Sequence, residues 1–92
     1  MASSRLASRG NADVGLIYER EIRAMRRIVD ERLGDLDSST VAAVERNLAI
    51  IDRAIEDSRR ALARDPRSRF LSTQLDHALE NKLSIMRRVA LL

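Results

Sequence analysis

The chain contains no cysteine among its 92 residues. Without a thiol it can form no disulfide, no thiolate metal site and no cysteine nucleophile. It also has no tryptophan and only one tyrosine and one phenylalanine, so it lacks a row of aromatic rings on which nucleic-acid bases could stack. Three glycines and one proline are too few for the turns of a multi-stranded sheet. These absences favour an all-α protein.

Long hydrophobic runs and a large charge of one sign are lacking as well. The longest apolar runs reach four residues, as at 41–44 and 48–51, whereas a membrane-spanning helix needs about 18. Seventeen basic residues, all arginine except Lys82, are interleaved with 14 acidic ones, so the net charge is only +3. We therefore expect no membrane span within these residues and no binding of nucleic acid.

What the sequence does contain is helical periodicity, most clearly in the stretch 37–65. Six apolar side chains there fall in one heptad frame and predict a long helix over 38–64 with a continuous apolar stripe: Val41, Val44, Leu48, Ile51, Ile55 and Leu62. Asp37 is the predicted N-cap of this helix. Glu56 and Arg60, four residues apart, are a favourable pair on its solvent side. We expect this helix to be the axis of the fold.

Two further stripes flank that stretch and predict two more helices. The first helix, over 13–33, should begin at the N-cap Asp13 and end at Gly34 in the left-handed conformation. On its surface, Glu19 and Arg23 have the spacing of an ion pair. Residues 1–12 combine Ser, Ala, Gly and Arg without an acidic residue, and we interpret them as a flexible leader or linker.

The third predicted helix covers 66–90, with Asp65 as its N-cap and Pro66 at its first position. Because the connection is so short, this helix and the preceding one should form an antiparallel hairpin. The helix over 13–33 would then pack into the groove between the other two. The sequence therefore predicts one all-α domain over 13–92, built as a three-helix bundle or as part of a dimeric bundle.

Reaction chemistry is poorly represented. His77 is the single histidine, and with Asp76 and Glu80 nearby it could be a metal ligand, but a site without a second histidine would be weak. An exposed helical histidine is the commoner outcome. We expect no catalytic residue, no cofactor and no metal, and the chain is not predicted to be an enzyme.

A cluster of three carboxylates, Asp52, Glu56 and Asp57, lies on one turn of the predicted middle helix. Carboxylates act as acid and base only where burial separates their pKa values. Arginines surround this cluster in the sequence, so we interpret it as a solvated face of ion pairs.

Apolar side chains outside the main stripes are the candidates for a contact with another protein. Ile28, Ile50 and Ile85 lie on the flanks of their helices and could complete a larger bundle. Tyr18 is either a core residue with its hydroxyl at the rim or a further point of contact. We expect the partner to be a second copy of the chain, in a homodimer, or another helical protein.

Three stretches together resemble one protein family. They are YEREI at Tyr18–Ile22, VERNLAIIDRAIEDSRRALARDP at Val44–Pro66, and LENKLSIMRRVALL at Leu79–Leu92. They are similar to the extracytoplasmic helical domain of some membrane-anchored bacterial anti-sigma factors. In that family a cytoplasmic zinc-binding module grips a sigma factor, and a transmembrane helix joins it to the outer domain.

The resemblance implies a non-catalytic sensor or scaffold domain on the periplasmic or extracytoplasmic face, which controls transcription through a sigma factor. The family's His-x-x-x-Cys-x-x-Cys module and membrane helix have no counterpart in these residues, so no sigma-binding residue can be assigned, and Ser38 stands where the family often has proline. The alternative from the residues alone is a free-standing, cytoplasmic helical module, related to tetratricopeptide or coiled-coil adaptors, that uses the same apolar stripe to bind a partner helix. Residues 54–79 have the layout of one tetratricopeptide unit, but arrays of that kind need three or more units, so we interpret the likeness as a general property of helical hairpins.

Overall fold

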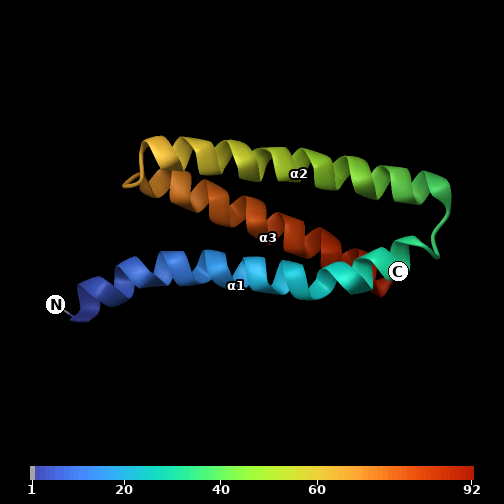
Figure 1. Ribbon diagram of the computed structural model, residues 1–92, viewed down its shortest axis with the longest axis horizontal. Helices are drawn as coiled ribbons and strands as arrows, with labels where there is room; N and C mark the ends of the chain where they lie inside the picture. The colour runs from blue at the N-terminus through green and yellow to red at the C-terminus, as the bar shows by residue number, and fades with distance from the viewer. Residues whose placement is uncertain (1) are drawn as a thin grey trace.

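The computed structural model consists of three helices, α1 (Ala2–Leu33), α2 (Ser38–Arg64) and α3 (Arg69–Leu91) (Figure 1). It describes the backbone of residues 2–92 and the side chains of residues 15–92. Helices α1 and α3 run in the same direction, and α2 runs antiparallel to both. The predicted all-α class is confirmed, and so is the antiparallel hairpin of α2 and α3.

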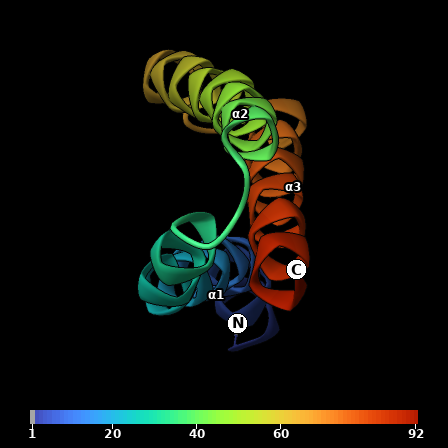
Figure 2. The ribbon, with the colours of Figure 1, turned by 90° about the vertical axis from the view of Figure 1, so that its right-hand side faces the viewer.

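The central element of the fold is α3. Helices α1 and α2 each pack along α3 and barely contact one another. Viewed end on, α3 lies to one side of α1 and α2 and extends from one to the other (Figure 2). Among the described side chains, α3 supplies most of those that are buried: Leu79, Leu83, Met86 and Val89. Helix α1 adds Ile22 and Val29, whereas α2 adds only Ile55.

The prediction that the stretch 37–65 is the axis is therefore wrong, and α1 does not pack into a groove between the other two helices. The reason is the width of the apolar face. Helix α2 has a single fully buried side chain, Ile55, and packs on one neighbour, whereas α3 has four and packs on both other helices.

Helix α2 has the predicted bounds, because its start depends on local chemistry. The side chain of Asp37 accepts a hydrogen bond from the backbone N–H of Thr40, and it also accepts bonds from the hydroxyls of Ser39 and Thr40. These bonds, led by the one from Ser39, stabilise the carboxylate and lower the pKa of Asp37 to about 2. The stability that this cap contributes is present above pH 4 and is lost as the pH falls toward 2.

The end of α1 differs from the prediction. Gly34 does not adopt a positive φ angle, so it is not the left-handed residue we expected. Its N–H continues the helical pattern by donating to the carbonyl of Asp30 at 3.3 Å. The next two amides, of Asp35 and Leu36, then bond to carbonyls three residues earlier, and this tightening closes the helix without a left-handed cap.

The start of α1 lies upstream of the predicted residue 13, because the helix extends back to Ala2. Asp13 is therefore within the helix and does not cap it. The segment contains no proline, and a single Gly10 costs about 1 kcal/mol in a helix, which is not enough to end one. The interpretation of residues 1–12 as a flexible leader or linker stays a prediction.

The start of α3 was also predicted wrongly. Asp65 is the C-cap of α2, and its N–H donates to the carbonyl of Ala61. The N-cap of α3 is Ser68, whose side chain accepts a hydrogen bond from the N–H of Leu71 at 3.2 Å. The Asp-Pro pair thus belongs to the turn, and serine, an equally good capping residue, begins the helix three residues later.

The position of Leu83 at the centre of the core leads to a first prediction. Leu83 is 2% exposed, so Leu83→Ala should lower the free energy of unfolding by about 2 to 5 kcal/mol, the usual range for a buried leucine. Denaturant unfolding followed by circular dichroism measures this loss. The control is Ile50→Ala, which truncates a side chain that is 68% exposed and should change stability little. Equal losses in both variants would contradict this assignment of the core.

The N-cap of α3 leads to a second prediction. Ser68→Ala removes the acceptor for Leu71 and should destabilise the protein by about 0.5 to 2 kcal/mol. Asp65→Ala, which leaves the backbone cap of α2 intact, should cost less than about 0.5 kcal/mol. Thermal melting of the two variants distinguishes the observed start of α3 from a start at Asp65, for which the order of the two effects would be reversed.

Candidate functional site

A cleft of about 360 Å³ lies between α1 and α2, with α3 behind it. It exists because the two outer helices pack on α3 and barely on each other. Its floor is made by three buried apolar side chains, one from each helix: Ile22, Ile55 and Leu79. Its rim is charged and carries Glu19, Arg23, Asp52, Glu56, Arg59 and Lys82. An apolar centre with a polar rim is the arrangement found in many protein–protein interfaces.

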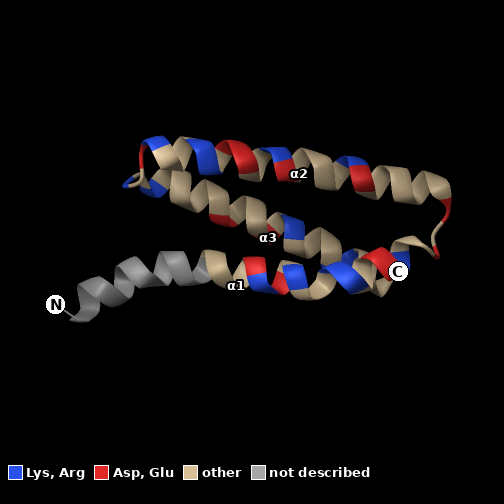
Figure 3. Cartoon of the chain, in the orientation of Figure 1, with Lys and Arg blue, Asp and Glu red and all other residues tan. Residues whose placement is uncertain are grey.

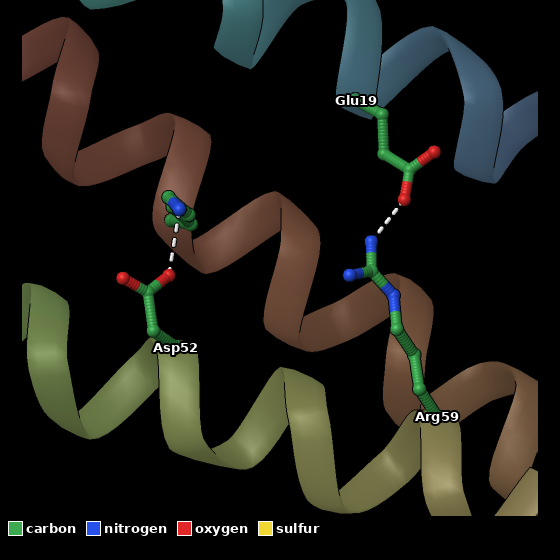
Figure 4. Close-up of polar contacts among 4 residues, drawn as sticks. Glu19, Asp52 and Arg59 are labelled. Atoms are coloured by element: carbon green, nitrogen blue, oxygen red, sulfur yellow. Dashed lines mark hydrogen bonds and ion pairs between the residues drawn. The ribbon is translucent and has the colours of Figure 1, made fainter.

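One ion pair crosses the cleft. The guanidinium of Arg59 on α2 donates to the carboxylate of Glu19 on α1 (Figure 4). Glu19 was expected to pair with Arg23, its neighbour four residues along α1. It instead reaches a partner 40 residues away in the sequence, and only the packing of both helices on α3 brings the two side chains together.

A second ion pair lies beside the first and joins α2 to α3. Lys82 Nζ donates to Asp52 Oδ1 at 2.6 Å (Figure 4). The side chain of Lys82 is 13% exposed, because its aliphatic part lies along the apolar floor while its ammonium group reaches the rim. A third pair, Arg87 with Glu21, joins α3 to α1. Each pair of helices is therefore joined by one described ion pair.

The carboxylate cluster of α2 is divided between different partners. Asp52 contacts Lys82, and Glu56 makes the predicted pair with Arg60 at 3.5 Å. Asp57 is exposed. Two of the three predicted carboxylates are therefore in ion pairs at the surface, and the third is exposed.

The predicted partner surface is not brought together at the cleft. Tyr18 and Ile85 are half-buried and pack against the core of their own chain. Ile28 and Ile50 are exposed, at 48% and 68%, and lie on different helices. None of the four residues lines the cleft. The homodimer to which they were assigned stays a prediction.

His77, the candidate metal ligand, is exposed on α3. Among residues 15–92, no three His, Asp or Glu side chains are grouped closely enough to hold a metal ion. Both basic and acidic residues occur along the described parts of all three helices (Figure 3). No helix within the described residues is both long enough and apolar enough to cross a membrane.

The pairing of Glu19 with Arg59 and of Asp52 with Lys82 was not predicted. The signal in the sequence is only that charged residues lie next to the apolar stripe of each helix, and this holds for many other positions. Which of them meet depends on how far the helices are rotated about their axes, and neither periodicity nor spacing specifies that rotation.

Comparisons with known proteins assign no family or function to the chain. No family model, no curated protein and no solved structure matches the chain.

One carboxylate facing α1 has a perturbed pKa. Asp76 on α3 is half-buried, and a Cβ atom placed on Gly15 would lie 3.6 Å from its Oδ1. Burial raises the pKa of Asp76 by removing water from the charged form, and this outweighs the opposite effect of His77. A carboxyl group whose pKa is raised on folding binds its proton more tightly in the folded state. It therefore destabilises the fold increasingly as the pH rises above 4.

We predict that Asp76→Asn stabilises the protein at pH 7 and that this gain disappears at pH 3, where Asp76 is protonated in both states. Melting temperatures of the variant and the wild type at the two pH values measure the effect. Asp57→Asn, which alters an exposed carboxylate on α2, is the control and should change the melting temperature at pH 7 less. A gain for Asp76→Asn of the same size at both pH values would contradict the prediction.

Proposed function

We propose that the chain is a non-catalytic helical sensor or scaffold domain of an envelope anti-sigma factor, which regulates transcription through contacts with other proteins. In this proposal, a separate module of the full protein holds the sigma factor. Binding at the helical domain changes whether that module retains or releases the sigma factor. The domain would lie on the outer face of the membrane.

The observation that carries the proposal is where the three stretches that resemble this family lie in the fold. Tyr18–Ile22 contributes Glu19 and Ile22 to the cleft. Val44–Pro66 contributes the whole α2 side, and Leu79–Leu92 contributes Leu79 and Lys82. All cleft residues except Arg23 therefore come from the three stretches. Segments far apart in the sequence thus converge on one surface, which supports a shared role for them in binding.

The chemistry of that surface also fits a binding role better than a catalytic one. Its floor is apolar, and the carboxylates of its rim are occupied by ion pairs: Glu19, Asp52 and Glu56. A partner that brought its own apolar side chains would bury the floor, while its polar groups exchanged with the ion pairs at the rim.

The test has two stages. The native gene is first read upstream of residue 1, where the proposal expects a membrane helix preceded by a His-x-x-x-Cys-x-x-Cys segment. Glu56→Lys and Glu45→Lys are then compared in the full protein, in its host, by transcription from the promoter of the cognate sigma factor. Both residues are exposed glutamates of α2, but only Glu56 lines the cleft.

Glu56→Lys should change sigma-dependent transcription at least severalfold, because it reverses a charge on the binding surface, and Glu45→Lys should leave it unchanged. Equal effects of the two variants would count against the cleft as the regulatory surface. A gene in which translation starts at Met1 would rule out the anti-sigma assignment.

The alternative function is a free-standing helical adaptor that binds a partner helix. The observation that favours it is the apolar floor of the cleft, whose aliphatic side chains, Ile22, Ile55 and Leu79, are of the type that receives the apolar face of a helix. The reading of the native gene separates the two functions, since the adaptor requires no membrane helix or zinc-binding segment.

A further inference from the structure

The relative position of α1 and α2 depends on unusually few contacts. The two helices barely touch, and among the described residues Glu19–Arg59 is the one ion pair that joins them. The connection between them, residues 34–37, crosses the space that separates their ends (Figure 2). Both helices are held to α3, but their separation from each other is set by the rotation of each about α3.

The contacts of α3 with α1 and with α2 are more extensive than the contact between α1 and α2. Between α1 and α3, and between α2 and α3, buried apolar side chains accompany the ion pair, including Val29, Ile55 and Leu83. If the Arg87–Glu21 pair were lost, the buried apolar contacts between α1 and α3 would remain. Loss of the Glu19–Arg59 pair would leave the chain connection 34–37, at one end of the two helices, as the main direct link between α1 and α2.

We propose that the Glu19–Arg59 pair is a strap that holds the cleft at its observed width, and that breaking it allows α1 and α2 to rotate apart about α3. The pair connects α1 to α2 (Figure 4), and both of its residues line the cleft together with the floor residues Ile22, Ile55 and Leu79. Opening would expose more of this apolar floor. The proposal concerns a movement within the chain and does not rest on the proposed function.

The strength of the strap is suited to a reversible switch. The side chain of Arg59 is 46% exposed and that of Glu19 is 29% exposed, so solvent and salt weaken their attraction. Breaking a pair of this kind changes the ratio of closed to open molecules by up to about fivefold. A change of this size can be produced by salt or by a partner that offers a competing charge to either residue.

The experiment measures the separation of α1 and α2 directly. Because the sequence has no cysteine, spin labels can be attached uniquely at Arg26→Cys on α1 and Ala49→Cys on α2, two exposed positions outside the cleft. Double electron–electron resonance then gives the distribution of distances between the labels. This distribution is compared between the labelled wild type and strap variants that retain wild-type helicity by circular dichroism.

Glu19→Gln and Arg59→Gln should each broaden the distribution toward longer distances. The double variant Glu19→Arg with Arg59→Glu restores an ion pair of reversed polarity and should restore the wild-type distribution. Raising the salt from 0.1 to 1 M, which shortens the screening length from about 10 to about 3 Å, should move the wild type toward the Glu19→Gln distribution and leave that variant unchanged.

The matched control is Glu21→Gln, which breaks the Arg87–Glu21 pair between α1 and α3. It removes the same charge from the same helix, two residues away, and should leave the distances between the labels unchanged. Three results would overturn the proposal: an unchanged distribution in both single strap variants, equal broadening in Glu21→Gln, or failure of the charge-reversed pair to restore the distribution. If one single variant does not fold, the other and the salt titration still decide the outcome.

Discussion

The fold depends on the burial of one broad apolar face, that of α3. Its buried residues, Leu79, Leu83, Met86 and Val89, extend far enough around the helix for two neighbours to cover them. A chain of 92 residues can build only a small core, with a total stability of a few kcal/mol to about 10 kcal/mol. Concentrating the core on one helix lets two amphipathic helices share it, and each of them then needs only a narrow stripe.

The same arrangement explains the cleft. Because α1 and α2 bury their apolar stripes against α3, little apolar surface remains for a contact between them. The cleft with its charged rim therefore lies between α1 and α2. One ion pair joins each pair of helices. Among the described residues, the Glu19–Arg59 pair is the one that crosses the cleft between α1 and α2. Exposed pairs contribute little to stability, but such a pair can determine the separation of two helices where no packing competes with it.

The residues that line the cleft determine its chemistry. Its rim carboxylates Asp52 and Glu56 are paired with basic residues. His77 lies exposed on α3, outside the cleft, and no three His, Asp or Glu side chains among residues 15–92 are grouped closely enough to hold a metal ion. What the cleft offers is an aliphatic floor, a rim with both signs of charge and walls that belong to different helices. These properties are the basis of the proposed role in binding another protein, and in the proposed opening, movement of the walls would change how much of the floor is accessible.

The sequence by itself determined the features whose causes are local. The three-helix class follows from apolar periodicity, and both the bounds of α2 and its cap at Asp37 follow from a few adjacent residues. Local chemistry was less decisive where two residues could serve the same purpose: Asp65 and Ser68 are both good caps, and the structure uses Ser68. Only the tertiary structure decided that α3 is central, and that Glu19 meets Arg59 and not Arg23. Helix order and rotation depend on which stripes bury the most surface together, and this is a property of all three helices at once.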